Sequence, residues 1–342
     1  MPPKKQQAKE GKRGVKKSAA KVIAASDFHQ ALRFTPEKAA KSPLGEPISN
    51  YDAKCSIAAL RKEAKRVGFD AQAYLQNGYC VLSPVWSAKE IQEAHEAAQR
   101  VRFMSTSSDG KGEFVFLRGS STPDKLALFS LLNRYIPFLH QLLGGIVLPN
   151  SDKSPYAHHN QVQVALKTPG FKGYKPLEQM SSSRVGHIDQ STARQNPPGK
   201  PSSNYSVLFG VVLSGDTAHR SDAGNLYLAP GSYKKLASAF QKLEGPKIPW
   251  YPNIAEKYLG KEDPKMEAVR AGPGQAIIMH HQTVHGVGPN HSETDRLNVY
   301  FRITARGRPR GKKTSYPQAM RDPFLETPLL KTLADQPDGD DP

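Results

Sequence analysis

The sequence predicts a mainly β fold with flanking helices, in which a β-sandwich or jelly-roll core follows a helical first half. Three observations lead to this prediction. Apolar residues recur at helical spacing before residue 150, short stretches alternate with period two after residue 160, and loops rich in glycine and proline separate those stretches. Many short strands divided by such loops are typical of antiparallel two-sheet folds.

The helical half is marked by end signals as well as by spacing. Ser87 and Glu90 form the capping-box pattern that begins a helix, and Thr122-Pro123 places a capping side chain before a proline at the first helical position. Helices are expected at 52–67, in a short segment that ends at Gly78, from 87 to about 102, and from 122 to Gly144-Gly145.

The second half contains the predicted strands. They cover residues 161–166, 206–213, 225–228, 266–270, 275–279 and 297–304. Two segments rich in proline, glycine and serine, 168–186 and 191–204, lie between the first two of these strands. Long segments of this kind in a compact domain are usually functional loops, which draws attention to the residues between them.

The net charge of +17 is concentrated in two segments. Residues 1–21 carry eight Lys/Arg and one Glu, a charge of +7, and residues 306–313 carry five basic residues and no acidic one. The remaining +5 is ordinary for an enzyme surface. We therefore expect the basic character to belong to the tails, and residues 1–22 to be disordered.

Several classes of protein are excluded by composition. No apolar run approaches the ~18 residues of a membrane span, and the N-terminus lacks the apolar stretch of a secretory signal. Cys55 and Cys80 are the only cysteines, which argues against a disulfide framework or a structural zinc site. We expect a cytoplasmic or nuclear protein with no membrane span.

His187-Ile188-Asp189 is the first candidate for chemistry. On an extended strand, residues i and i+2 point to the same face, so an imidazole and a carboxylate would lie side by side. These are two of the three protein ligands in the 2-His-1-carboxylate site that binds Fe(II). This triplet occurs by chance in many sequences, so it indicates a metal site only if a third ligand accompanies it.

The third ligand is expected in residues 279–290, where His280, His281 and His285 compete. His281 and His285 are four residues apart, as in helical zinc sites, but a metalloprotease is excluded because the general-base Glu is missing and two glycines would end any helix. We expect His285 instead to close a strand before a glycine-rich turn. Arg296 follows eleven residues later, at the start of the next predicted strand.

Taken together, these residues resemble the phytanoyl-CoA dioxygenase family of Fe(II)/2-oxoglutarate-dependent oxygenases. The resemblance rests on His187-x-Asp189, His285 and Arg296 in order, with further matches at 224–232 (GNLYLAPGS) and 76–82 (QNGYCVL). It covers roughly residues 70–305. It implies a double-stranded β-helix, the jelly roll of the cupin type, for the core.

The resemblance also implies roles for single residues. His187, Asp189 and His285 would bind Fe(II), and 2-oxoglutarate and O₂ would take the open positions. Arg296 would pair with the distal carboxylate of 2-oxoglutarate, a task that suits a planar guanidinium. Gln163 and Lys167, on the strand before His187, match positions that contact the co-substrate or substrate.

The reaction implied by the resemblance is the hydroxylation of a C–H bond with release of succinate and CO₂. Related halogenases replace the metal-binding carboxylate with a small residue so that chloride can bind. Asp189 is present here, so halogenation is not expected. The expected substrate is a small molecule or a lipid-like acid.

The run Arg306-Gly307-Arg308-Pro309-Arg310-Gly311-Lys312-Lys313 resembles an AT-hook. Such a peptide lies in a narrow A·T minor groove, with Arg306, Arg308 and Arg310 supplying charge and hydrogen-bond donors. A plain basic loop is the alternative. With the Lys-rich N-terminus, which reads either as a targeting signal or as a solvated tail, it makes DNA or RNA contact and a nuclear location a second hypothesis.

Three parts of the chain follow from these observations. Residues 1–50 form a basic disordered tail and linker. Residues 51–305 form the dioxygenase domain, with helical support at 52–145 and a jelly-roll core at about 155–305. Residues 306–342 form the AT-hook-like segment and an acidic flexible tail. A nucleic-acid- or chromatin-associated oxygenase and a non-catalytic scaffold of the same fold are the alternatives to a small-molecule hydroxylase.

Overall fold

The structure is a computed structural model. It describes residues 51–104, 114–117, 122–147, 162–172, 188–189, 205–243, 265–307 and 315–336. All of these belong to one compact unit, residues 41–342. The predicted disorder of residues 1–50 and the position of His187 lie outside the described residues, as do most of the segments 168–186 and 191–204.

Two antiparallel sheets form the centre of the protein. The larger has the strand order β1-β8-β5-β10-β4-β2, with β3 paired to β10, and the smaller has the order β7-β6-β9. The strands of the larger sheet are β1 (Tyr79–Leu82), β2 (Phe114–Leu117), β3 (Ile146–Val147), β4 (Val162–Lys167), β5 (Val207–Ser214), β8 (Ala276–His280) and β10 (Arg296–Ala305). Those of the smaller are β6 (Leu226–Leu228), β7 (Glu267–Ala268) and β9 (His285–Val287).

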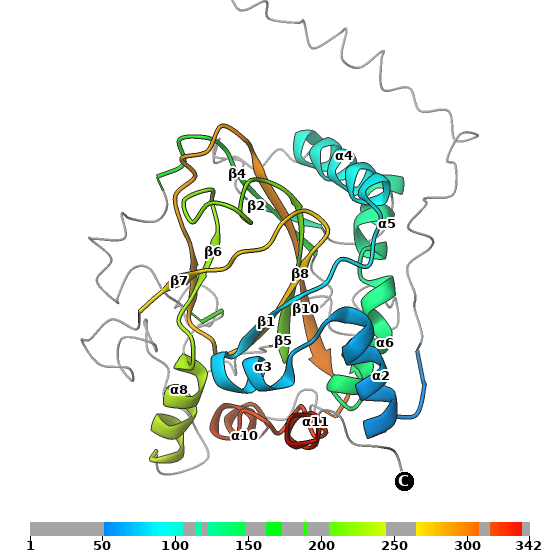
Figure 1. Cartoon of the computed structure of the whole chain (residues 1–342), viewed down its shortest axis with the longest axis vertical. Helices are drawn as coiled ribbons and strands as arrows, with labels where there is room; N and C mark the ends of the chain where they lie inside the picture. The colour runs from blue at the N-terminus through cyan, green and yellow to red at the C-terminus, as the bar shows by residue number, and fades with distance from the viewer. Residues whose placement is uncertain are drawn as a thin grey trace, which may run out of the picture. The chain divides into compact units, whose positions relative to one another are not determined.

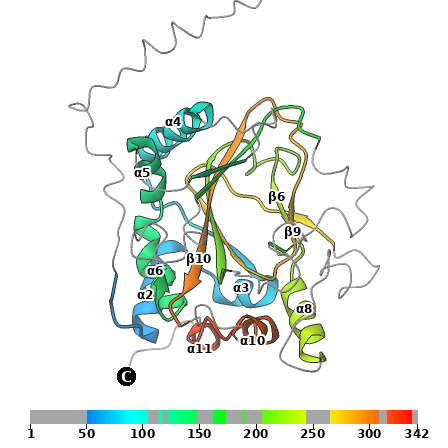
Figure 2. The ribbon, with the colours of Figure 1, turned by 180° about the vertical axis from the view of Figure 1, so that it is seen from behind.

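The chain passes repeatedly from one sheet to the other. From β5 it crosses to β6 and β7, returns to β8, crosses to β9 and returns to β10. Figures 1 and 2 show β6 on one side of the molecule and β10 on the other, with helices outside the larger sheet. Alternation between two antiparallel sheets defines a jelly roll. The core is a double-stranded β-helix, and the predicted fold class is confirmed.

The helices form a layer on the outer face of the larger sheet and a layer at one end of it (Figure 1). The first layer contains α2 (Ile57–Val67), α4 (Ala88–Met104), α5 (Pro123–Ser130), the 3-10 helix η2 (Asn133–Tyr135) and α6 (Ile136–Leu142). The second contains α3 (Ala71–Asn77), α10 (Ser315–Arg321) and α11 (Leu330–Asp335), while α8 (Ser232–Gln241) lies below the smaller sheet and packs on α10.

The predicted caps are present and explain where the helices begin. The Ser87 hydroxyl accepts from the Glu90 amide at 3.3 Å, and Glu90 Oε2 accepts from the Ser87 amide at 2.8 Å, which is a complete capping box. Thr122 Oγ1 accepts from the Lys125 amide at the start of α5. At the end of α3, Gly78 has a φ of +81°, which a residue with a side chain rarely adopts.

Two apolar clusters lie on the two faces of the larger sheet, one on each face. On the outer face, alternate residues of β10 such as Leu297, Val299 and Phe301 are buried against the helices. On the inner face, Tyr300 packs with Leu226 of the smaller sheet. Side chains alternate along a strand. The polar residues of β10 that lie between Leu297, Val299 and Phe301 must therefore also face the smaller sheet.

The structure corrects the prediction for the C-terminal part. The segment 306–342 was expected to be a basic segment and a flexible tail, but α10 and α11 fold onto the domain. Met320, Leu330 and Leu333 are buried there, since α10 packs on α8 and α11 packs on α3 and α2. The folded domain therefore extends from the predicted 305 to about residue 336.

His285 also differs from the sequence expectation. It begins β9 rather than closing a strand, because residues 281–284 turn the chain from the larger sheet into the smaller one. Strands β2 and β3 and helix α8 were not predicted. Within the described residues, no helix is long and apolar enough to cross a membrane.

Candidate metal and co-substrate site

Asp189 and His285 meet between the two sheets. The distance from Asp189 Oδ1 to His285 Nε2 is 3.7 Å, and both side chains are buried, with 10% and 7% of their surface exposed. This distance is too long for a hydrogen bond. It is close to the ~3 Å that separates two ligands each about 2.1 Å from a shared metal ion. Both atoms can therefore reach one metal ion placed between them.

The imidazole of His285 is oriented for that purpose. Its Nδ1 lies 3.1 Å from the Thr283 carbonyl oxygen. Because a carbonyl only accepts, Nδ1 must carry a hydrogen, so in the neutral ring Nε2 holds the lone pair that faces Asp189. A backbone carbonyl that fixes the tautomer in this way is usual behind a metal-binding histidine.

The other oxygen of Asp189 is held by two side chains of the larger sheet and its flank. Tyr205 Oη donates to Oδ2 at 2.8 Å. Arg302 donates to the same oxygen from Nη2 at 2.7 Å and from Nε at 3.1 Å. The two oxygens of Asp189 thus have different surroundings, and only Oδ1 faces His285.

Arg296, the predicted co-substrate anchor, lies at the start of β10 and is fully buried. Nη2 donates to Tyr300 Oη at 2.8 Å. Nε and Nη1 have no hydrogen-bond partner within the described part of the chain. A buried guanidinium with unpaired donors is costly, so these two nitrogens point to an anionic ligand.

Lys167 and Gln163 lie where the sequence placed them, on β4 beside β10. In the antiparallel register Lys167 pairs with Arg296 and Gln163 with Tyr300, so their side chains share one face. Lys167 is buried, with Nζ 4.2 Å from the centre of the Phe171 ring. Gln163 Oε1 accepts from Arg302 Nη1 at 3.0 Å, which brings Gln163 to the Asp189 end of the site.

The structure describes two of the three predicted metal ligands, Asp189 and His285. Among the described residues, no group of three His, Cys, Asp or Glu residues could hold a metal ion. His187, which would be the third, lies outside the described residues. Asp189 and His285 of the predicted triad lie close together, and metal binding by the triad stays a prediction.

The competing histidines have other contacts. His280 Nε2 lies 2.9 Å from the Pro323 carbonyl oxygen, and His281 Nδ1 lies 3.2 Å from the Ser206 carbonyl oxygen. His280 also packs on the Tyr233 ring. Neither is paired with Asp189, so His285 is the histidine of this segment that belongs to the site.

Tyr205 and Arg302 are not among the residues that the sequence predicts for the site. A signal for Arg302 was present, because it lies six residues after Arg296 on one strand and so shares its face. Tyr205 gave no such signal, since its contact with Asp189 depends on how the intervening segment folds.

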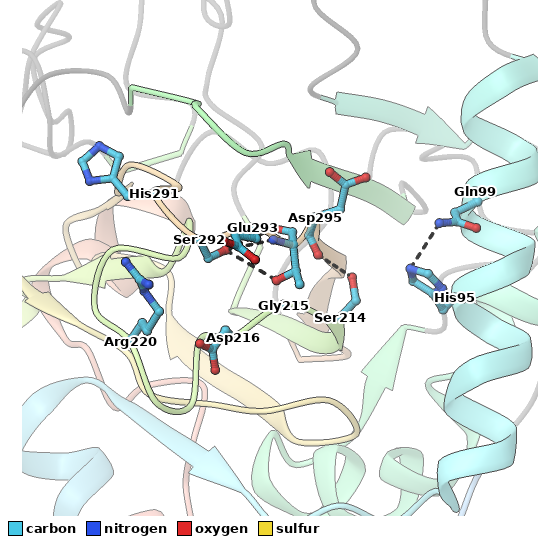
Figure 3. A pocket seen from close by; sticks show the side chains of 11 residues that line it. His95, Gln99, Ser214, Gly215, Asp216, Arg220, His291, Ser292, Glu293 and Asp295 are labelled. Atoms are coloured by element: carbon cyan, nitrogen blue, oxygen red, sulfur yellow. Dashed lines mark hydrogen bonds between the residues drawn. The ribbon is translucent and has the colours of Figure 1, made fainter.

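A surface pocket lies at the loops next to the first residues of β10. Figure 3 shows that α4 contributes His95 and Gln99 to it, and that two loops supply the rest. The lining residues are His95, Gln99, Ser214, Gly215, Asp216, Arg220 and residues 291–295. Ser214 Oγ donates to the Asp295 carbonyl oxygen at 2.8 Å, which ties the two loops together. No predicted site residue lines this pocket.

Arg306 is the one AT-hook arginine that the structure describes. Its Nη1 contacts Asp52 Oδ1 at 2.6 Å and its Nη2 donates to the Tyr51 carbonyl oxygen. These contacts tie Arg306 to the domain surface. Arg308 and Arg310 lie outside the described residues, so contact of this segment with nucleic acid stays a prediction.

No family model and no curated protein matches the sequence. Among solved structures, the chain is similar to EctD from S. alaskensis with 2-oxoglutarate and 5-hydroxyectoine, at 16% identity, TM-score 0.46, and coverage of 76% of this chain and 80% of that one. It is also similar to SnoK, a non-heme alpha ketoglutarate dependent carbocyclase from nogalamycin biosynthesis, at 15% identity, TM-score 0.46, and coverage of 73% and 85%. Identities and TM-scores this low give no evidence of function. Evidence for the function must come from the chain's own side chains.

Proposed function

We propose that this protein is an Fe(II)- and 2-oxoglutarate-dependent dioxygenase. His187, Asp189 and His285 would hold the metal, and Arg296 would bind the distal carboxylate of 2-oxoglutarate. The observation that carries the proposal is the buried guanidinium of Arg296, which keeps two donors without a partner in the described structure, on the same inner sheet face as Arg302. Arg302 in turn contacts Asp189, one of the two described ligands.

The residues divide the task of holding the co-substrate. Nε and Nη1 of Arg296 suit two parallel hydrogen bonds to one carboxylate. Tyr300 holds the third nitrogen and so fixes the plane of the guanidinium. Lys167, the cross-strand neighbour of Arg296, adds a second positive charge near the same carboxylate.

Bound Fe(II) would activate O₂ so that decarboxylation of 2-oxoglutarate is coupled to oxidation of a C–H bond. For hydroxylation, one oxygen atom of O₂ enters the product alcohol and the other enters succinate, and CO₂ is released. The chain's part is to bind the two substrates next to each other and to exclude water. Burial of Asp189 and His285 between the sheets serves this exclusion.

The proposed substrate is a small molecule or a lipid-like acid. Support comes from the same burial, because a C–H bond must enter the space between the sheets to reach Asp189 and His285. A small or extended molecule can do so more easily than a duplex or a folded protein. We propose a cytoplasmic or nuclear location, the nuclear one favoured by the basic segments; a tagged protein with and without residues 1–22 would test it.

The proposal is tested by succinate formation. The purified full-length protein, with Fe(II) and 2-oxoglutarate under air, is expected to release succinate slowly alone and faster with a suitable metabolite. His187→Ala and Asp189→Ala should abolish release, while Arg220→Gln, which removes a surface ion pair with Asp222, should not. Absence of metal binding by the wild-type protein would instead support the scaffold alternative.

The same assay with oligonucleotides in place of metabolites tests the nucleic-acid alternative. DNA affinity is measured over a salt series, since contacts to phosphate weaken as salt rises. Binding that is lost on deletion of residues 1–22 with Arg308→Ala and Arg310→Ala would favour that alternative. Absence of binding at low salt would remove it.

A further inference from the structure

One oxygen of the Asp189 carboxylate, Oδ2, accepts three hydrogen bonds. This atom accepts from Tyr205 Oη at 2.8 Å and from Arg302 Nη2 and Nε at 2.7 and 3.1 Å. The Oδ1 atom faces His285 Nε2. An oxygen with three donors at these distances has no lone pair directed elsewhere, so the carboxylate cannot rotate without breaking several hydrogen bonds.

Arg302 is itself held in place. Nη1 donates to Gln163 Oε1 at 3.0 Å, and the guanidinium carbon lies 5.5 Å from the centre of the Tyr205 ring. Burial disfavours its charged form, but the Asp189 carboxylate and Tyr205 outweigh burial and raise the pKa of Arg302. It therefore stays charged, and each of its three nitrogens has a described partner.

We infer that Arg302 is a positioning residue for the metal, which it serves through Asp189. With Tyr205 it forms a clamp on Oδ2 that presents Oδ1 alone to the metal. A carboxylate held in this way binds through one oxygen. Without the clamp it can turn and bind through both, which would fill a position that the co-substrate or O₂ needs.

This inference rests on the proposed function, since it assigns a role at the same site. One alternative makes the opposite prediction. If Arg302 only screened the charge of Asp189, removing its charge would strengthen the attraction between Asp189 and a metal cation. If Arg302 positions Asp189, removing it would weaken binding, as loss of a group that orients a metal ligand typically costs about 10–100-fold in affinity.

Two variants of Arg302 separate these alternatives. Arg302→Lys keeps the charge but cannot make the two-nitrogen contact with Oδ2, and Arg302→Gln loses the charge. Co(II) is the probe, bound to the full-length protein without oxygen and followed by its visible absorption. The clamp predicts that both variants bind Co(II) tenfold to a hundredfold more weakly, with an altered absorption band. Unchanged binding by Arg302→Lys with tighter binding by Arg302→Gln would overturn the inference.

Two controls distinguish loss of the Arg302 clamp from misfolding and from failure of the proposed function. Tyr205→Phe removes one donor without a change of charge and should weaken Co(II) binding by a smaller factor. Arg220→Gln breaks an exposed arginine–aspartate pair, in which two nitrogens contact the two oxygens of Asp222 at 2.8 and 3.0 Å, and should bind Co(II) as the wild type does. Wild-type protein that binds no Co(II) contradicts the proposed function, whereas wild-type-like binding by Arg302→Lys contradicts only the clamp.

Discussion

Arg296 permits a test in which stability and ligand binding should change in opposite directions. In Arg296→Met the protein loses the hydrogen bond to Tyr300, worth about 1 kcal/mol. It also loses two buried donors that have no described partner, each of which costs about 1–3 kcal/mol. Without 2-oxoglutarate, the variant is therefore expected to be as stable as the wild type or more stable.

Binding of 2-oxoglutarate should respond in the other way. A carboxylate that enters this buried site without its guanidinium is an unpaired charge, and breaking such a pair costs about 3–5 kcal/mol. That corresponds to a loss of affinity of roughly 10²- to 10³-fold or more. Arg296→Lys keeps the charge but not the two parallel bonds, so an intermediate loss is expected.

Thermal unfolding with and without 2-oxoglutarate measures both effects. With Mn(II) in place of iron, ligand at about 100 times its Kd should stabilise the wild type by about 2.7 kcal/mol, and at the same concentration Arg296→Met should show almost no shift. Arg220→Met provides the surface control. A variant that is destabilised without ligand yet keeps the ligand-dependent shift would show that Arg296 is structural.

Three further predictions concern the frame around the site. A Cβ at Gly210 would lie 2.6 Å from Tyr300 Cε1, so Gly210→Ala should displace the ring that holds Arg296 and weaken 2-oxoglutarate binding. Gly307 has open space around it, so Gly307→Ala should leave binding unchanged. Equal binding by both variants would contradict this prediction. Removing residues 315–342 takes away the buried side chains of Met320, Leu330 and Leu333. Each contributes about 1.5–3 kcal/mol by its burial, so the truncated protein should unfold at much lower urea, and an unchanged midpoint would refute the packing. Burial raises the pKa of Glu90, but hydrogen bonds from Ser87 and the Arg134 ion pair outweigh it and lower that pKa. A lowered pKa stabilises the fold above the ordinary value of 4.5, and this stability is lost as pH falls through the lower folded value. Urea unfolding of Glu90→Gln should therefore approach the wild type at acidic pH, and a constant difference would contradict the linkage.

The sequence predicts this fold well where local signals and packing agree. The capping pairs at α4 and α5 and the alternation along β4, β5 and β10 all correspond to elements of the structure. Tyr233, Leu236 and Phe240 of α8 have helical spacing, but the preceding Pro230-Gly231 indicates a turn, so the sequence did not predict this helix. The two C-terminal helices are only seven and six residues long, too short for a helical period to stand out in the sequence.

The site was predicted in its parts but not in its connections. His285 and Arg296 were found from their order and spacing, and the structure places one beside Asp189 and the other, buried, on the inner sheet face. The contact of Tyr205 with Asp189 depends on the path of a long segment between two strands. Long-range pairings of this kind leave no periodic trace in a sequence, so they require the folded structure.

The side chains of strand β10 alternate between two faces. One face packs in the apolar core and the other carries the polar residues of the proposed site. Leu297, Val299, Phe301 and Ile303 are buried against the helices, while Arg296, Asn298, Tyr300 and Arg302 occupy the opposite face. The Asn298 amide contacts Tyr300 Oη at 3.0 Å, which continues the polar row. A shift of one residue in the register with β4 would exchange the two faces. The apolar packing that stabilises the domain therefore also fixes where the Arg296 anchor and the Arg302 clamp lie relative to Asp189.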